Sequence, residues 1–345
     1  MLDLDGLAGA GHLVLAVSGG PDSVALMLLA ARQPLAGTRF SVATVDHGLR
    51  EGSAGEAANV AAWAAALGFA HETLVWAGPK PRTGIQEKAR DARYGLLCAH
   101  ARATGASGIV TAHHAGDQAE TILFRLGKGS GIAGLAGMRA KTMRGDIAHW
   151  RPLLQVPKAE LVALCQQSGH GFFDDPSNRN HAFSRPRLRR LAGLLQTEGL
   201  DHAGLLRLGQ RAARAEDALS EMTARAAREW QAQRAAGVFS APAAFLATVP
   251  AELGMRLVGR EIAGVTGLAE PLRLERLERG FGRMTAAIAS GSSLATSLGG
   301  ALLRLDRSGT LHITPEPPRR RGRHTGPPDS VSPLPPHDAE PLTTR

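Results

Sequence analysis

The chain has 345 residues, with 40 Lys and Arg against 31 Asp and Glu, so its formal net charge is +9 at pH 7. This length favours two domains with a sizeable core, and the positive charge favours a polyanionic partner such as a nucleic acid. The two cysteines, Cys98 and Cys165, lie far apart, which excludes a disulfide framework and any CxxC redox or metal motif.

Short β-like runs alternate with helical patterns through the first 126 residues. Strands are expected at His12–Val17, Arg39–Val45, His71–Trp76 and Gly108–Ala112. Helices are expected at Asp22–Ala31, Ala54–Leu67, Ile85–Ala103 and Gly116–Leu126. This alternation is typical of βαβ units and predicts an α/β fold with a mostly parallel, Rossmann-like sheet. A ligand of such a sheet belongs at the carboxyl ends of the strands.

The second half of the chain shows three further patterns. The Gly-rich stretch GKGSGIAGLAG predicts a mobile loop, and a helix is expected to begin near Pro157. From Leu205 onward, apolar residues recur at steps of three and four, which predicts one long amphipathic helix leading into a second domain. The stretch LGGALLRLDRSGTLHITPE predicts a β-hairpin that turns around Asp306–Gly309.

These patterns predict three parts: an α/β domain over 1–195, a smaller, mainly helical domain with a terminal hairpin over 196–315, and a tail over 316–345. The tail is rich in proline and arginine and lacks apolar periodicity, so we expect it to be disordered. No apolar run is long enough to cross a membrane, and no secretory signal opens the sequence. We therefore expect a cytoplasmic protein with reduced thiols and no membrane partner.

The stretch SGGPDS joins the first expected strand to the first expected helix. Backbone N–H groups and the dipole at a helix start favour an anion, and glycine lets phosphate oxygens approach closely. The stretch lacks the lysine and spacing of a Walker A loop. Asp22 is placed to hold Mg²⁺ beside the phosphates. We predict a phosphate-binding turn, with an ordinary capped turn as the alternative, formed by Ser18, Gly19, Gly20, Pro21, Asp22 and Ser23.

SGGPDS resembles the PP-loop of the ATP pyrophosphatases, which split ATP between its α and β phosphates. Four further stretches are similar to the tRNA(Ile)-lysidine synthase family: VDHGLR, EKARDARYGLL, AHHAGDQAETILFRL and DPSNRNHAFSRPRLR. The five motifs occur in order within about residues 10–195. The resemblance implies a PP-loop, adenine nucleotide alpha hydrolase-like domain and an AMP-forming carbon–nitrogen ligase that uses ATP and Mg²⁺.

The resemblance further implies that free L-lysine is joined to C2 of the wobble cytidine in isoleucine tRNA with a CAU anticodon. The cytidine is first adenylated, and the product reads AUA in place of AUG. ATP leaves as AMP and pyrophosphate. The resemblance does not fix the oligomeric state, for which a homodimer is one candidate.

Several residues are assigned catalytic or binding roles on the matching motifs. Arg93 is the candidate residue that stabilises the negative charge developing on the α-phosphate in the transition state. The alternative is that Arg93 forms a salt bridge on the helix surface. Asp117 and Glu120 lie three residues apart, hence on one helix face. The resemblance implies that this pair binds the lysine, and we assign it to catalysis together with Asp22. Besides the turn, the expected nucleotide contacts are Asp46, His47 and His113.

A basic stretch follows the catalytic motifs. Arg179–Arg190 holds five arginines, which are ordinarily read as a solvated helix start. Such density beside a catalytic domain also suits the phosphates of a folded RNA, and two of these arginines match family positions. We predict tRNA contacts by Arg179, Arg185, Arg187 and Arg189, and we expect the helical domain over 196–315 to bind tRNA as well.

The sequence departs from the family at two positions. Gly116 precedes Asp117 where the family has two consecutive aspartates, and Lys128 stands where an arginine is usual. Two other functions stay open at this point. A PP-loop cytidine thiolase would need cysteines for a cluster or a persulfide, and this chain has only two, which lie far apart. A non-catalytic, nucleotide-dependent RNA-binding protein is favoured only by Gly116.

Overall fold

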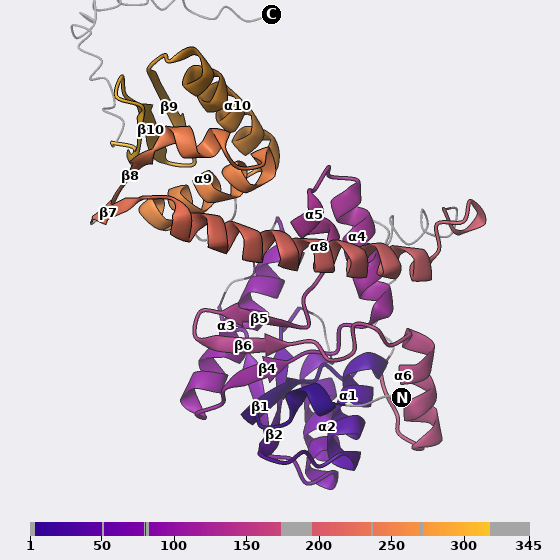
Figure 1. The fold of residues 1–345 in the computed structure, drawn as a ribbon. Helices are drawn as coiled ribbons and strands as arrows, with labels where there is room; N and C mark the ends of the chain where they lie inside the picture. Colours follow the sequence, from indigo (N-terminus) through magenta and orange to yellow (C-terminus); the bar gives the residue numbers. More distant parts are fainter. Residues whose placement is uncertain are drawn as a thin grey trace, which may run out of the picture. The chain divides into compact units, whose positions relative to one another are not determined.

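The computed structural model describes residues 4–49, 52–78, 80, 83–173, 195–235, 237–268 and 272–317. The chain forms two compact units, Met1–Ala226 and Ala227–Arg345, so the boundary lies inside the long helix α8 (His202–Glu229). The sequence analysis places the change of domain at residue 195. Each unit has a sheet of its own (Figure 1).

The N-terminal unit is built on a six-stranded sheet in the order β3-β2-β1-β4-β6-β5. The pairs joining β3, β2, β1, β4 and β6 are parallel, and β5 runs antiparallel to β6. The expected parallel α/β sheet is therefore confirmed. Its strands are β1 (Gly11–Ala16), β2 (Thr38–Asp46), β3 (His71–Val75), β4 (Gly108–Val110), β5 (Lys141–Arg144) and β6 (Ile147–Trp150).

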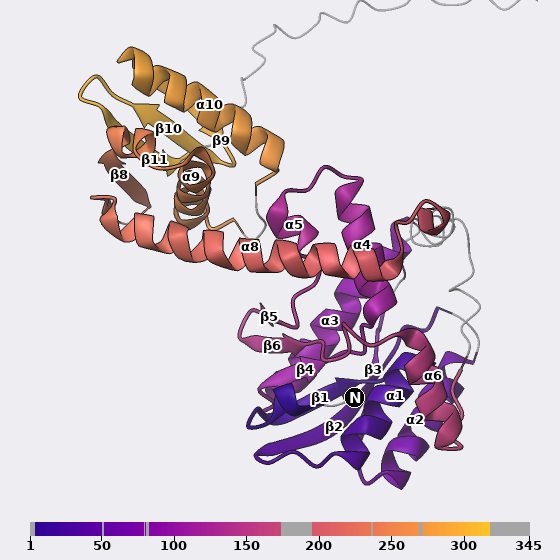
Figure 2. The same ribbon diagram turned by 45° about the vertical axis from the view of Figure 1, so that its right-hand side comes forward.

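Helices pack on both faces of this sheet (Figure 2). Successive side chains of a strand point to opposite faces. Leu13 and Leu15 of β1 accordingly pack with α1, α2 and α6, whereas Val14 packs with α3. The helices of this unit are η1 (Asp5–Leu7), α1 (Pro21–Arg32), α2 (Ser53–Ala66), α3 (Ile85–Ala103), α4 (Ala115–Leu126), α5 (Ile132–Leu135), α6 (Lys158–Gln167) and α8 as far as Ala226.

The four helices expected in the first half are present, and α6 begins where the sequence predicts. The Gly-rich stretch differs from its prediction as a loop, because it contains the short helix α5. Helix α8 is the expected amphipathic helix, and its Leu205 packs against Ala119 and Ile122 of α4. Gly209 permits this approach, since a β-carbon there would lie 2.5 Å from Ile122.

The C-terminal unit holds an antiparallel five-stranded sheet in the order β7-β8-β11-β10-β9. Helices α9 (Ala251–Thr266) and α10 (Leu274–Ser290) and the 3-10 helix η3 (Ala243–Ala247) complete it. The hairpin expected around Asp306–Gly309 is confirmed, whereas the sequence analysis did not identify the other three strands. The strands are β7 (Gln233–Ala235), β8 (Val238–Pro242), β9 (Leu294–Leu298), β10 (Ala301–Leu305) and β11 (Thr310–Pro315).

The proline- and arginine-rich tail lies outside the described residues from 318 onward, so the expectation of disorder there stays a prediction. Within the described part of the chain, none of the helices has the length and apolar character needed to cross a membrane.

Candidate active site

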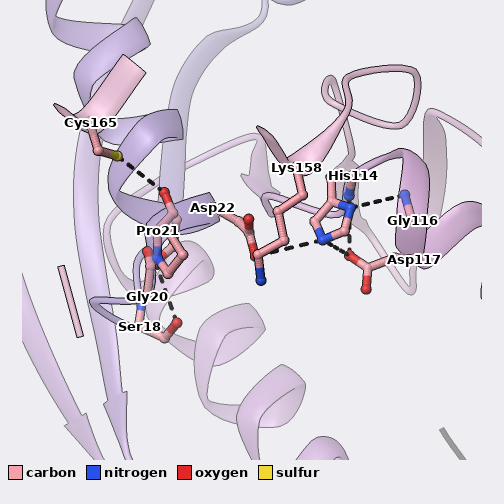
Figure 3. A network of polar contacts seen from close by, with 10 residues as sticks. Ser18, Gly20, Pro21, Asp22, His114, Gly116, Asp117, Lys158 and Cys165 are labelled. Carbon is pink, nitrogen blue, oxygen red and sulfur yellow. Dashed lines mark hydrogen bonds and ion pairs between the residues drawn. The ribbon is translucent and has the colours of Figure 1, made fainter. Parts of the chain in front are cut away.

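The SGGPDS turn lies between the carboxyl end of β1 and the start of α1. Gly20 is the N-cap of α1, and Pro21 is its first residue. Two hydrogen bonds within the turn stabilise it. Ser18 N–H donates to Ser23 Oγ at 3.1 Å, and Ser23 Oγ donates to the Gly20 carbonyl at 2.9 Å. Ser18, Gly20 and Pro21 are seen in this turn in Figure 3. Such a turn, opening a helix with free N–H groups, can hold an anion.

Gly19 fits this turn for two reasons. Its φ of +84° is a left-handed conformation that side chains rarely adopt. A β-carbon at Gly19 would also lie 2.5 Å from the ring of Phe173, whose N–H donates to the Gly19 carbonyl at 2.9 Å. Both the backbone conformation and the close approach of Phe173 therefore require glycine.

Asp22 meets residues from two other elements at the start of α1 (Figure 3). Its Oδ2 lies 3.7 Å from His114 Nε2 and 3.7 Å from Lys158 Nζ. Burial raises the pKa of the Asp22 carboxyl, while His114 and Lys158 oppose the rise. Its Oδ1 is buried and has no hydrogen-bond partner among the described residues. A buried carboxylate oxygen without a partner is unfavourable unless a ligand supplies one.

His114 caps α4 and connects Asp22 with Asp117. Its Nδ1 accepts a hydrogen bond from Gly116 N–H at 3.0 Å, so the ring proton lies on Nε2. That Nε2 is 3.7 Å from an oxygen of Asp117, which also accepts from His114 N–H at 3.1 Å. His114 therefore links the phosphate turn and the Asp117 motif in the structure.

These two motifs follow β1 and β4, the strands where the sheet order changes direction. Crevices at such switch points are where open α/β sheets bind ligands. Asp117 and Glu120 are both half-buried and share the face of α4 opposite to the one packed on Leu205. Their carboxylates suit a ligand that carries amino groups.

Arg93 on α3 lies close to two of the expected nucleotide contacts. Its charge, after burial, lowers the pKa of His47 and of His113, which reaches about 2. The guanidinium carbon is 5.1 Å from the Tyr94 ring centre, and Nε is buried with no hydrogen-bond partner among the described residues. Arg93 therefore lies near His47 and His113, and its catalytic role stays a prediction.

Asp46, another of the expected nucleotide contacts, lies at the end of β2. Its Oδ1 accepts from Gly48 N–H at 2.9 Å, and hydrogen bonds from Ser53 and Gly48 lower its pKa. The carboxylate therefore caps the end of β2. His47 beside it packs edge-on against Trp76, with ring centres 6.1 Å apart.

Five residues near the site were not identified from the sequence. They are supplied by α6, by the end of β4 and by the β5–β6 hairpin, an element that the sequence analysis missed. No spacing in the sequence relates these residues to the PP-loop. Lys158 alone carries a signal, because it is a positively charged residue at the start of a helix that the sequence predicts. The residues are Thr111, Arg144, His149, Arg151 and Lys158.

Both cysteines are free and buried. Cys165 Sγ lies 3.5 Å from the Pro21 carbonyl, directly behind the phosphate turn. Burial raises the pKa of Cys98 and raises that of Cys165 to about 11, so both remain thiols at neutral pH. The four arginines predicted to contact tRNA lie outside the described residues.

Comparison with known proteins identifies the family. The PP-loop domain family matches residues 4–194. The chain is 50% identical over 321 residues to the tRNA(Ile)-lysidine synthase of Methylobacterium sp. strain 4-46, covering 92% of both chains. The chain belongs to the tRNA(Ile)-lysidine synthase family. The tRNA(Ile)-lysidine synthase of Bradyrhizobium diazoefficiens is 45% identical over 336 residues, which cover 91% of this chain and 92% of that one.

A solved structure supports the fold of the catalytic unit. The U34-tRNA thiolase NcsA from Methanococcus maripaludis, with its [4Fe-4S] cluster, superposes with a TM-score of 0.51. It is 14% identical, and the match covers 59% of this chain and 73% of that one. This likeness extends to the fold alone. The two buried thiols of the present chain offer no set of cysteine ligands for such a cluster.

Proposed function

We propose that the protein joins L-lysine to C2 of the wobble cytidine of isoleucine tRNA with a CAU anticodon, at the expense of ATP. The observation that carries the proposal is the 50% identity to a tRNA(Ile)-lysidine synthase over 92% of both chains. The closed SGGPDS turn and the neighbouring carboxylates of α4 support it independently. The enzyme would act in the cytoplasm, and a homodimer is the assembly to test by sedimentation.

The first step forms a bond between the cytidine O2 and the α-phosphorus and breaks the bond to pyrophosphate. The backbone N–H groups of Gly19, Gly20, Asp22 and Ser23 are suited to hold the leaving pyrophosphate. Pro21 has no N–H, and the Ser18 N–H donates to Ser23 Oγ. Arg93, aided by His113, is suited to the negative charge that grows on the α-phosphate oxygens. Both side chains lie at the same edge of the sheet as the turn.

The second step forms the bond between the lysine ε-nitrogen and C2 of the cytidine. It breaks the bond between C2 and the adenylated oxygen, which leaves as part of AMP. The ε-amine must lose a proton in this step. Asp117 and Glu120 are suited to bind the ammonium groups of lysine, and the chain supplies them on one face of α4. Asp117 lies about one helix turn from His114 and Glu120 about one turn further, so a lysine bound between them would lie near the phosphate turn.

Magnesium fits the site in one respect. The buried Asp22 Oδ1 lacks a partner, and carboxylate oxygen is a ligand that Mg²⁺ prefers. Within the described residues no three metal-binding side chains converge, so Asp22 would share the ion with phosphate oxygens, as is usual for nucleotide-bound magnesium. When bound, the ion would neutralise charge on the pyrophosphate.

The test is incorporation of labelled lysine with ATP into transcripts of isoleucine tRNA and methionine tRNA. We expect incorporation only into the isoleucine transcript, with one AMP and one pyrophosphate released per lysine. Asp22→Ala should abolish incorporation while tRNA binding persists. Release of ADP, or incorporation after the wobble cytidine is replaced by uridine, would contradict the proposal.

A further inference from the structure

A chain of hydrogen bonds runs from the β5–β6 hairpin to His113. Arg151 Nη2 lies 2.9 Å from His149 Nδ1, and Arg144 Nε donates to the same nitrogen at 3.3 Å. The other ring nitrogen of His149 lies 2.8 Å from Thr111 Oγ1. That hydroxyl also lies 2.8 Å from His113 Nδ1. His149 is fully buried, and Thr111 and His113 are buried as well.

The donor and acceptor groups of these side chains determine which atom donates in each of the hydrogen bonds. A guanidinium group can only donate, so His149 Nδ1 must be an acceptor without a proton. The proton of a neutral His149 therefore lies on Nε2, which donates to Thr111 Oγ1. The single hydroxyl proton of Thr111 is then available for His113 Nδ1. This leaves the proton of the His113 ring on Nε2.

The charges around the two rings agree with this assignment. The charged groups that face His113 are Arg90 and Arg93 of α3 and Arg151, and His149 also faces it. Burial, followed by these cations, lowers the pKa of His113 to about 2 and that of His149 to about 3. Both rings are thus neutral at physiological pH, and each offers exactly one donor and one acceptor.

The surroundings also show which ligand such a donor suits. Arg151 is buried, and its hydrogen-bond partners among the described residues are neutral: the Arg139 carbonyl at 2.8 Å, the Thr142 hydroxyl and the His149 ring. Arg144 stacks on the Tyr94 ring with its guanidinium carbon 3.7 Å from the ring centre. A group of partly desolvated cations with neutral partners favours an anion nearby.

We propose that the chain Arg151–His149–Thr111 fixes His113 as a neutral Nε2–H donor to an α-phosphate oxygen of the nucleotide. Arg151, His149 and Thr111 are positioning residues in this assignment, and His113 is the group that touches the phosphate. The inference rests on the proposed function for the identity of the ligand. The tautomer of His113 does not depend on it. A donor oriented before the reaction stabilises growing negative charge without reorganisation.

The first experiment is nitrogen-15 NMR of the histidine rings in the full-length, ligand-free protein. The signals of His113 and His149 are assigned with the variants His113→Gln and His149→Gln. We expect both rings to carry their proton on Nε2 and to keep it there between pH 6 and 8. Protonation on Nδ1, or a doubly protonated ring in this range, would overturn the proposal without any functional assay.

The second experiment measures pyrophosphate release from ATP and tRNA without lysine, which isolates the first step. Thr111→Val preserves shape and removes the hydroxyl, whereas Thr111→Ser preserves the hydroxyl and loses a methyl group. We expect Val to lower the rate about tenfold or more, and Ser to stay within about threefold of the parent. A purely structural role for Thr111 predicts the reverse order, because Ser would leave a cavity and Val would not.

Two variants of His149 test the same hydrogen bonds independently, in case the Thr111 variants do not fold. Gln offers an acceptor toward Arg151 and a donor toward Thr111, whereas Leu offers neither. His149→Gln should therefore release pyrophosphate several times faster than His149→Leu. Equal rates of pyrophosphate release in these two variants would contradict the proposed role of the hydrogen bonds between Arg151, His149 and Thr111. If the parent enzyme releases no pyrophosphate, the proposed function fails, while the NMR result still decides the tautomer.

Discussion

The imidazole of His114 occupies the space that a side chain at Gly116 would need. A β-carbon at residue 116 would lie 2.8 Å from Cε1 and 3.1 Å from Nδ1 of that ring. The glycine also donates its N–H to Nδ1. The ring thereby lies back over the first turn of α4 and directs Nε2 toward Asp22 and Asp117. The departure from the family's paired aspartates therefore has a geometric role in this chain.

Gly116→Ala should displace the His114 ring and loosen the position of Asp117. We expect kcat/KM for lysine to fall about tenfold, which corresponds to about 1.4 kcal/mol. Steady-state kinetics at saturating ATP measures this. Gly95→Ala is the matched control, since residue 95 is also in a helix and a β-carbon there meets nothing within 4 Å. Equal behaviour of the two variants would refute the role of Gly116.

Gly19→Ala should disrupt the phosphate turn. The added methyl group meets the Phe173 ring and the backbone must keep a φ of +84°. Because misplacement of reacting groups by about 1 Å can cost a hundredfold in rate, we expect at least that loss in pyrophosphate release. Gly68→Ala separates the two causes, because Gly68 has a φ of +80° and open space around it. A comparable loss in Gly68→Ala would mean that general destabilisation, and not the turn, is responsible.

Glu120→Gln should raise the KM for lysine far more than the KM for ATP. Loss of one charge-assisted hydrogen bond costs about 1.5–3 kcal/mol, so a rise of roughly tenfold to a hundredfold is expected. Initial rates at varied lysine and varied ATP provide both constants. Glu160→Gln, at an exposed glutamate in α6, should change neither constant. A similar rise in both constants for Glu120→Gln would remove the lysine assignment.

Replacing Arg185 and Arg189 together by Glu should weaken tRNA binding and reduce its dependence on salt. Each phosphate contact that is lost reduces the slope of log K against log salt by about one. Binding titrations between 50 and 200 mM salt measure the slope. Both residues lie outside the described part of the chain, so the stretch is judged by this experiment. A slope equal to that of the parent would leave these arginines as ordinary surface charges.

Local patterns predicted the elements that are governed by local forces. Helix α3 begins and ends at the residues expected from its periodicity, and the strand-turn-helix around SGGPDS is where the motif predicts it. The β5–β6 hairpin escaped prediction because its strands have four residues each and β5 reads KTMR, without an apolar alternation. Short strands such as these are stabilised mainly by their neighbours in the sheet.

The contacts around the site depend on pairings that no local pattern contains. Thr111 and His149 meet because β4 and β6 lie side by side, and their register pairs Ile109 with His149. Lys158 reaches Asp22 because α6 packs on α1. Sequence motifs therefore identified the residues that we propose to contact the ligands, while the residues that hydrogen-bond to them became known only from the tertiary structure.

The thiol of Cys165 lies 3.5 Å from the Pro21 carbonyl in the SGGPDS turn, and its burial has a chemical consequence. Peroxides and electrophiles attack thiolates, and this sulfur remains protonated. A buried, protonated thiol such as this one is a poor target for those reagents at neutral pH.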